Sequence, residues 1–142
     1  MADVLTGAIS ASDVSNSFLQ AVFAVAQYRT TIDEDGDVVV HGDGLQVWVL
    51  LDQPSHRLRF FAAFALKEDT AHADVLQAVN DFNEAYAVAR AYTVRRGPGA
   101  RGVFFDSDIT YGGGLIPINM LTRFRIFENI LKSEHPVRRL LA

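Results

Sequence analysis

Two neighbouring segments of the chain, 45–51 and 58–66, have the period-2 pattern of β-strands and carry apolar residues on both of their faces. A strand in a sheet that is covered on one side only needs apolar residues on one face. The second set must therefore be covered by something: a helix of the same chain, a second copy of the chain, or a partner polypeptide. The residues for which we expect such a cover, as a partner or dimer face, are Trp48, Leu50, Phe61 and Ala63.

The rest of the chain alternates between helical and strand patterns. Apolar residues recur at helical spacing in three segments, and clusters of Gly, Asp and Pro separate the strands. The expected elements are a helix at about 12–28, a three-strand meander at about 38–66, a helix at about 70–85, a hairpin at about 88–110 and a helix at about 117–132. This α-β-β-β-α-β-β-α order predicts an α+β fold, an antiparallel five-stranded sheet packed with three helices. No linker interrupts it, so we expect a single domain over residues 1–142.

Composition excludes several classes of protein. The 142 residues are 49% hydrophobic and 21% charged, which is typical of a globular domain, and no apolar run approaches the roughly 20 residues of a membrane helix. The absence of cysteine excludes disulfides and thiolate metal sites. The net charge is −4, and the arginine clusters are short, so we expect no nucleic-acid partner. The first basic residue is Arg29, which leaves no signal-peptide start and favours a cytoplasmic location without membrane attachment.

Patterns that could hold a cofactor or a metal are present but incomplete. Residues 97–102 match G-x-G-x-x-G, yet a strand and not a helix follows, so a hairpin loop is the better interpretation. Asp33, Asp35 and Asp37 lack the glycine and glutamate of a calcium loop and indicate a solvated turn. The four histidines have no metal-ligand spacing. We therefore expect no cofactor and no metal.

The sequence offers little for catalysis. Asp106 and Asp108 lie two apart on a strand and could form a carboxylate pair, although two solvated aspartates are the commoner outcome. No other constellation of nucleophile and base is visible, so we expect no catalytic residues and no enzyme.

Asn80 and Asn83 stand near the end of an apolar helix, where asparagine is unfavourable because its amide competes with the backbone. Their i, i+3 spacing puts them on one face. Two interpretations stay open, and the first is favoured. The amides either latch the helix to a neighbouring strand or loop, or they line a polar pocket for a small ligand.

The segment Val79, Asn80, Asp81, Phe82, Asn83, a Val-Asn-x-x-Asn signature between a three-strand meander and a β-hairpin, resembles the bacterial YbjN family. The similarity extends from about residue 12 to about residue 132, and includes the glycine triplet 112–114 and the Phe-rich last helix. The resemblance implies a fold similar to the type III secretion chaperones, small acidic proteins that commonly dimerise and bind extended segments of partners. Proteins of this family are described as sensory transduction regulators.

Together, the two-faced strands and the absence of catalytic groups predict a non-enzymatic protein-interaction module, chaperone-like or a regulatory adaptor, that forms a homodimer and binds a polypeptide partner. The alternative is a small-ligand sensor with a pocket near Asn80 and Asn83.

Overall fold

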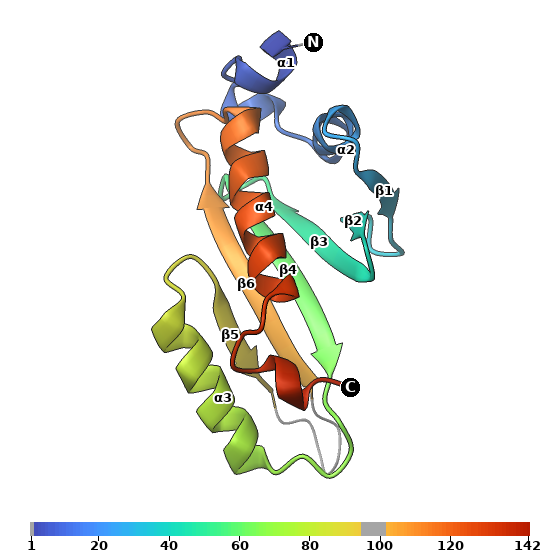
Figure 1. Cartoon of the computed structure of the whole chain (residues 1–142). Coiled ribbons are helices and arrows are strands. Elements are labelled where there is room, and N and C mark those ends of the chain that lie inside the picture. Colours follow the sequence, from blue (N-terminus) through green and yellow to red (C-terminus); the bar gives the residue numbers. More distant parts are fainter. Residues whose placement is uncertain (1, 95–101) are drawn as a thin grey trace.

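The computed structural model describes residues 2–94 and 102–142, and an antiparallel six-stranded sheet forms its centre (Figure 1). The strand order across the sheet is β1-β2-β3-β4-β6-β5. The longest pairing joins β4 to β6, in register from Arg57↔Thr110 to Ala65↔Gly102. The strands are β1 (Arg29–Ile32), β2 (Val38–Gly42), β3 (Leu45–Asp52), β4 (Arg57–Ala65), β5 (Arg90–Thr93) and β6 (Gly102–Thr110).

Helices cover one face of this sheet. In Figure 1, α4 crosses in front of β4 and β6. The ring of Phe23 in α2 packs on Phe124 of α4, and Phe82 of α3 packs on Phe105 of β6, so α2, α3 and α4 all lie on the same side. The helices are α1 (Ala2–Thr6), α2 (Asn16–Val25), α3 (His72–Ala85) and α4 (Pro117–Lys132), with short 3₁₀ turns η1 (Ala11–Asp13) and η2 (Arg138–Leu140).

The hydrophobic core lies between the helices and the sheet, and aromatic rings dominate its centre. Phe60 on β4 contacts Phe124 and Phe127 of α4, with ring centroids 5.4 and 6.3 Å apart. All three side chains are fully buried. The apolar stripe of α4 that the sequence predicts is therefore the stripe that covers the sheet, and Pro117 occupies the first turn of this helix, where its missing N–H costs nothing.

The sheet has six strands and not the expected five, and the first helix is shorter than the expected 12–28. Helix α2 ends at Val25, because Gln27 adopts a left-handed backbone conformation with φ 67°. The chain then forms β1, which the sequence did not predict. Its four residues, Arg-Thr-Thr-Ile, are mostly exposed at the edge of the sheet, so they lack the apolar alternation by which a half-buried strand is recognised. The additional helix α1 also went unpredicted.

The helix expected at 70–85 is observed as α3. Its N-cap is Ala71, without a side-chain bond, and the preceding Asp69 takes a left-handed turn with φ 59°. The buried side chains are Val75, Ala78 and Phe82, and Leu76 is 49% exposed. Helix α3 contacts the outer strand β5 and lies at the margin of the core.

The last ten residues fold back over the helix-covered face. His135 is buried between the rings of Phe82 and Phe105, with both centroids 5.3 Å away. Leu140 is buried, and Leu141 forms an antiparallel bridge with Leu66 just beyond β4. Helix α4 thus ends before Pro136, and the segment that follows packs against the core. In the described part of the chain, no helix is long and apolar enough to cross a membrane.

Candidate protein-interaction face

The face of the sheet opposite the helices has no helix over it among residues 2–94 and 102–142. Pairing of Trp48 with Phe61 and of Leu50 with Arg59 puts the expected partner or dimer residues on this face, which we call the open face. Trp48, Leu50 and Phe61 are half-buried by their neighbours, and Ala63 is exposed. Of the three covers considered from the sequence, the structure removes the first, a helix of the same chain.

Four aromatic side chains cross the open face in a continuous row, one from each of β3, β4, β6 and β5. The ring centroids of Trp48 and Phe61 are 6.4 Å apart, those of Phe61 and Phe104 5.7 Å, and those of Phe104 and Tyr92 5.4 Å. We call these four residues the aromatic row. Sequence reasoning missed Phe104 and Tyr92 as members, because the pairing Tyr92↔Phe104 depends on a strand register that the sequence alone does not give.

Arginines flank the aromatic row. The guanidinium carbon of Arg59 lies 5.8 Å from the Phe61 ring centroid, and that of Arg90 lies 4.8 Å from the Tyr92 centroid. Arg90 also donates two hydrogen bonds to Asp106, of 2.9 and 2.8 Å. These bonds and the charge of Asp106 raise the pKa of Arg90. The aromatic row is therefore flanked by arginines that stack on its rings, and aromatic residues and arginine are both enriched at protein-binding surfaces.

The two aspartates of β6 do not form a free acid–base pair. Asp106 is 4% exposed and is held by Arg90, so the expectation that it faces solvent is wrong. Asp108 accepts a 2.8 Å bond from Arg57. Each carboxylate therefore has its own arginine, and the two aspartates bond these arginines and not each other.

The acidic turn at the other margin of the open face supports Trp48. The indole Nε1 donates a 3.0 Å hydrogen bond to Asp33, whose other carboxylate oxygen accepts from the backbone N–H groups of Asp35 and Asp37. These bonds, led by the one from the Asp37 backbone, lower the pKa of Asp33. The carboxylates of Asp33, Asp35 and Asp37 lie within 4.8 Å of one another, but the oxygens of Asp33 already have partners. The turn thus orients the indole.

Asn83 and Asn80 are both exposed, but they differ in their contacts. The Asn83 side chain accepts a 2.8 Å bond from the backbone N–H of Ala91 and donates a 3.0 Å bond to its carbonyl, which ties α3 to β5. This geometry is that of the structural latch, because the oxygen and the nitrogen of the Asn83 amide each bond the same backbone unit.

The histidines lie apart, and among the described residues they form no group with other metal-ligating side chains. His41 bonds the hydroxyl of Thr31 at 2.8 Å, whereas His135 packs on phenylalanines. Burial, aided by the charge of Arg138, lowers the pKa of His135. Most of the glycine-rich loop 97–102 lies outside the described residues, so its hairpin interpretation stays a prediction.

Comparison with known proteins connects this fold to one family. The model of the YbjN family, described as "Putative bacterial sensory transduction regulator", matches residues 4–133. The crystal structure of YbjN from E. coli, described as "a putative transcription regulator", superposes with a TM-score of 0.75 at 12% identity and covers 91% of this chain and 96% of that chain. That identity is low enough that the superposition shows a shared fold only. No curated protein matches the chain. Because the family model spans almost the whole sequence, from the first helix to the end of α4, the chain belongs to the YbjN family.

Proposed function

We propose that this chain is a non-enzymatic regulator that acts by binding protein, and that its open face pairs with the open face of a second copy. The observation that carries the proposal is the aromatic row: four rings, each in contact with the next, on a sheet face that no helix of the described residues covers. Isolated apolar side chains on a surface are ordinary, but a contiguous aromatic surface marks an interaction site.

The size of the open face is adequate for a dimer. Strands β4 and β6 have nine residues each, β3 has eight and β5 has four. At about 3.3 Å per residue and about 4.8 Å per strand, these four strands present roughly 480 Å² in projection. A standard interface buries roughly 800 Å² per partner and a small one about 600 Å². Since protruding rings add to the projected area, the face approaches the lower end of this range.

The charges of the open face suit a second copy better than a strongly charged partner. Arginines and aspartates both occur there, in the pairs Arg57–Asp108 and Arg90–Asp106, around an uncharged aromatic centre. In a two-fold symmetric dimer the same patch of both subunits forms the interface, so the patch must be complementary to itself. A face with both signs at its rim meets that requirement, because an arginine of one copy can approach an aspartate of the other.

The description of the family as sensory transduction regulators supports the regulatory half of the proposal. In such a role the chain would bind a polypeptide partner as well as a second copy of itself. The chaperone-like or adaptor character of that partnership is part of the same proposal.

Sedimentation equilibrium tests the dimer. Wild-type chain at micromolar concentration should have about twice the monomer mass of 15.7 kDa. The variant Phe61→Ser with Phe104→Ser should sediment as a monomer. Its matched control is Leu76→Ser, which changes an apolar residue that is 49% exposed on α3 and leaves the open face intact.

A clean monomer for the wild-type chain would refute the dimer. A double variant that loses its circular dichroism signal and unfolds would show that the row is core, which also contradicts the proposal. Retention of helix and strand signal, together with loss of the dimer only in the double variant, is the expected result.

A further inference from the structure

Strands β3 and β4 separate before either of them ends. Their antiparallel register runs from Asp52↔Arg57 to Trp48↔Phe61 and stops there, although β3 begins at Leu45 and β4 continues to Ala65. Figure 1 shows the two strands diverging toward this end. We call the space between Leu45–Val47 of β3 and Ala62–Ala65 of β4 the split.

The hairpin of β2 and β3 packs against α4, and this contact explains why β3 separates from β4. A methyl group added at Gly42 would lie 2.9 Å from the Glu128 carboxylate, so the end of β2 packs directly against this helix. Glu128 also accepts a 3.1 Å bond from Tyr28 and is only 8% exposed. The hairpin therefore follows the helix layer, while β4 stays paired with β6 along its full length.

The split leaves backbone hydrogen-bonding groups without a ladder partner on β4. The N–H of Lys67 donates to Leu140, and the carbonyl of Ala65 accepts from Ala142, so residues 65 and 67 direct their backbone groups toward this edge. Alternation along an antiparallel strand directs those of Ala63 the same way. Ala63 is exposed, and the register with β3 does not reach it. An unpaired strand edge of this kind accepts an additional strand.

A short piece of strand already occupies the start of this edge. Leu141 forms an antiparallel bridge with Leu66, and the backbone N–H of Ala142 lies 3.0 Å from the Ala65 carbonyl. This segment runs antiparallel to β4 and lies next to the split. The edge is therefore able to bind an extended backbone in the described fold.

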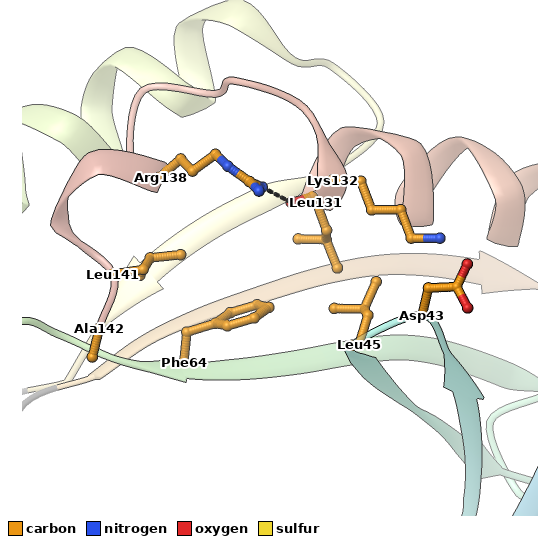
Figure 2. Close-up of a pocket in the computed structure, with 9 residues that line it drawn as sticks. Asp43, Leu45, Phe64, Leu131, Lys132, Arg138, Leu141 and Ala142 are labelled. Carbon is orange, nitrogen blue, oxygen red and sulfur yellow. Dashed lines mark hydrogen bonds between the residues drawn. The ribbon is translucent and has the colours of Figure 1, made fainter.

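Grooves open on both sides of the split and share Leu45 and Phe64. The groove on the helix side has a volume of about 320 Å³. Figure 2 shows Leu45, Phe64, Leu131 and Leu141 around it, with Lys132 and Asp43 at one end and Arg138 near the other. The groove on the open-face side has a volume of about 410 Å³ and is lined among others by Arg29, His41, Gln46, Trp48 and Ala63. An extended segment sends alternate side chains to the two sides, so it would meet the leucines and Phe64 on the helix side, between charged ends, and Arg29, Gln46 and Trp48 on the open-face side.

Charge indicates the chemistry of the occupant. Lys132 and Arg138 have acidic neighbours, with contacts of 3.6 Å to Glu128 and 3.5 Å to Glu134. Arg29, at the open-face groove, forms no ion pair among the described residues. A carboxylate on the inserted segment would complement it, and a lysine or arginine there would be repelled.

We propose that the split is the acceptor site for an extended segment of a partner polypeptide, which adds to β4 as an antiparallel strand beside Ala63. The segment carries an apolar side chain toward Leu45 and Phe64 and an acidic side chain toward Arg29. Backbone hydrogen bonds supply the affinity, and the alternate side chains supply the specificity. This proposal rests on the protein-binding function above and names the form of the partner. Because Trp48 and Ala63 line the open-face groove and also belong to the proposed dimer face, the segment and a second copy compete for these two residues.

The probe is a displayed library of random linear 12-residue peptides, selected against the folded full-length chain. Selected peptides should alternate apolar and acidic residues. With such a peptide bound, amide hydrogen exchange measured by NMR should slow at least tenfold at Ala63. The amides of Ala62 and Phe64 point at β6 and already belong to its ladder, so their exchange should not change.

A pair of variants checks the backbone contact. Ala63→Pro removes the N–H that faces the split and should weaken peptide binding at least tenfold, because proline is tolerated at a strand edge but cannot donate. Ala63→Val keeps the N–H and is the matched control, with binding within about threefold of wild type. Thermal melts establish that both variants fold.

Three results would overturn the proposal: a library that yields no binder, a binder that leaves the Ala63 exchange rate unchanged, or equal binding to both variants. The first two results are measured on the wild-type chain, so they do not depend on whether the variants fold. The dimer is measured separately by sedimentation, so a monomeric wild-type chain that still binds peptide at the split would refute the dimer and leave the acceptor site standing.

Discussion

Replacing Asn83 with alanine removes two hydrogen bonds to a single buried backbone unit. Ala91 is 1% exposed, and the Asn83 amide bonds both its N–H and its carbonyl. A buried polar group left without a partner costs about 1–3 kcal/mol. Two such groups give about 2–6 kcal/mol. Asn83 is itself exposed, so water can reach both groups in the variant and the lower part of this range applies. Alanine returns roughly 0.5 kcal/mol through its higher helix propensity. We therefore expect Asn83→Ala to lower the free energy of unfolding by about 2–3 kcal/mol.

Urea unfolding followed by circular dichroism measures this loss. With an m-value of about 2 kcal/mol/M, the midpoint should fall by roughly 1 M. Asn80→Ala is the matched control, because Asn80 lies on the same face of α3, one turn earlier, and is exposed. It should raise the midpoint slightly. All samples are compared at one protein concentration, since a dimer makes the midpoint depend on it. Equal midpoints for the two variants would refute the latch.

Three further changes test other parts of the fold. Gly114→Ala should lower the free energy of unfolding by about 1–3 kcal/mol, because φ is +110° and the new methyl would lie 3.1 Å from a backbone oxygen. The control Gly113→Ala, with open space around the new methyl, should leave the melting temperature unchanged. Phe60→Ala should lower the free energy of unfolding by about 4 kcal/mol, because Phe60 is fully buried. Phe61→Ala, on the open face, should lower it far less and weaken the dimer instead. Similar losses of stability would contradict the assignment of Phe60 to the core and of Phe61 to the open face. Burial lowers the pKa of His135 below 6.5, so the unfolded chain binds a proton at a higher pH than the folded chain does. The contribution of His135 to stability should therefore be full above about pH 6.5 and decrease as the pH falls below it. His135→Gln should reduce the change of the urea midpoint between pH 7.5 and 5.5, and an unchanged pH dependence would refute this explanation.

Much of the architecture follows from local pattern. The period-2 alternation of β3 and β4 and the helical spacing of α4 predicted these elements close to their observed bounds, because each buries a continuous apolar face. β1 was not predicted, because it buries no continuous apolar face. It is an edge strand of polar residues, stabilised by its pairing with β2 and by a turn at Gln27, and neither leaves an apolar period in the sequence.

The candidate site was predicted in part. Trp48, Leu50, Phe61 and Ala63 could be named from alternation alone, since it places them opposite Val47, Val49 and Phe60 on their strands. Tyr92 and Phe104 could not be assigned to the same row, because they come from strands whose register against β4 depends on contacts far apart in sequence. The arginine partner of Asp106 was unpredictable for the same reason.

The sequence by itself therefore determined which residues of each strand share a face, since the backbone of an extended chain fixes that alternation locally. Only the tertiary structure decided what lies on the two sides. It placed α2, α3 and α4 together over the face of Phe60 and Phe105 and left the aromatic row without a helix. It also separated β3 from β4 at the end where the hairpin of β2 and β3 packs against Glu128 of α4. Both outcomes depend on how distant segments pack, because the same amphipathic helices could cover either face of a sheet that is apolar on both.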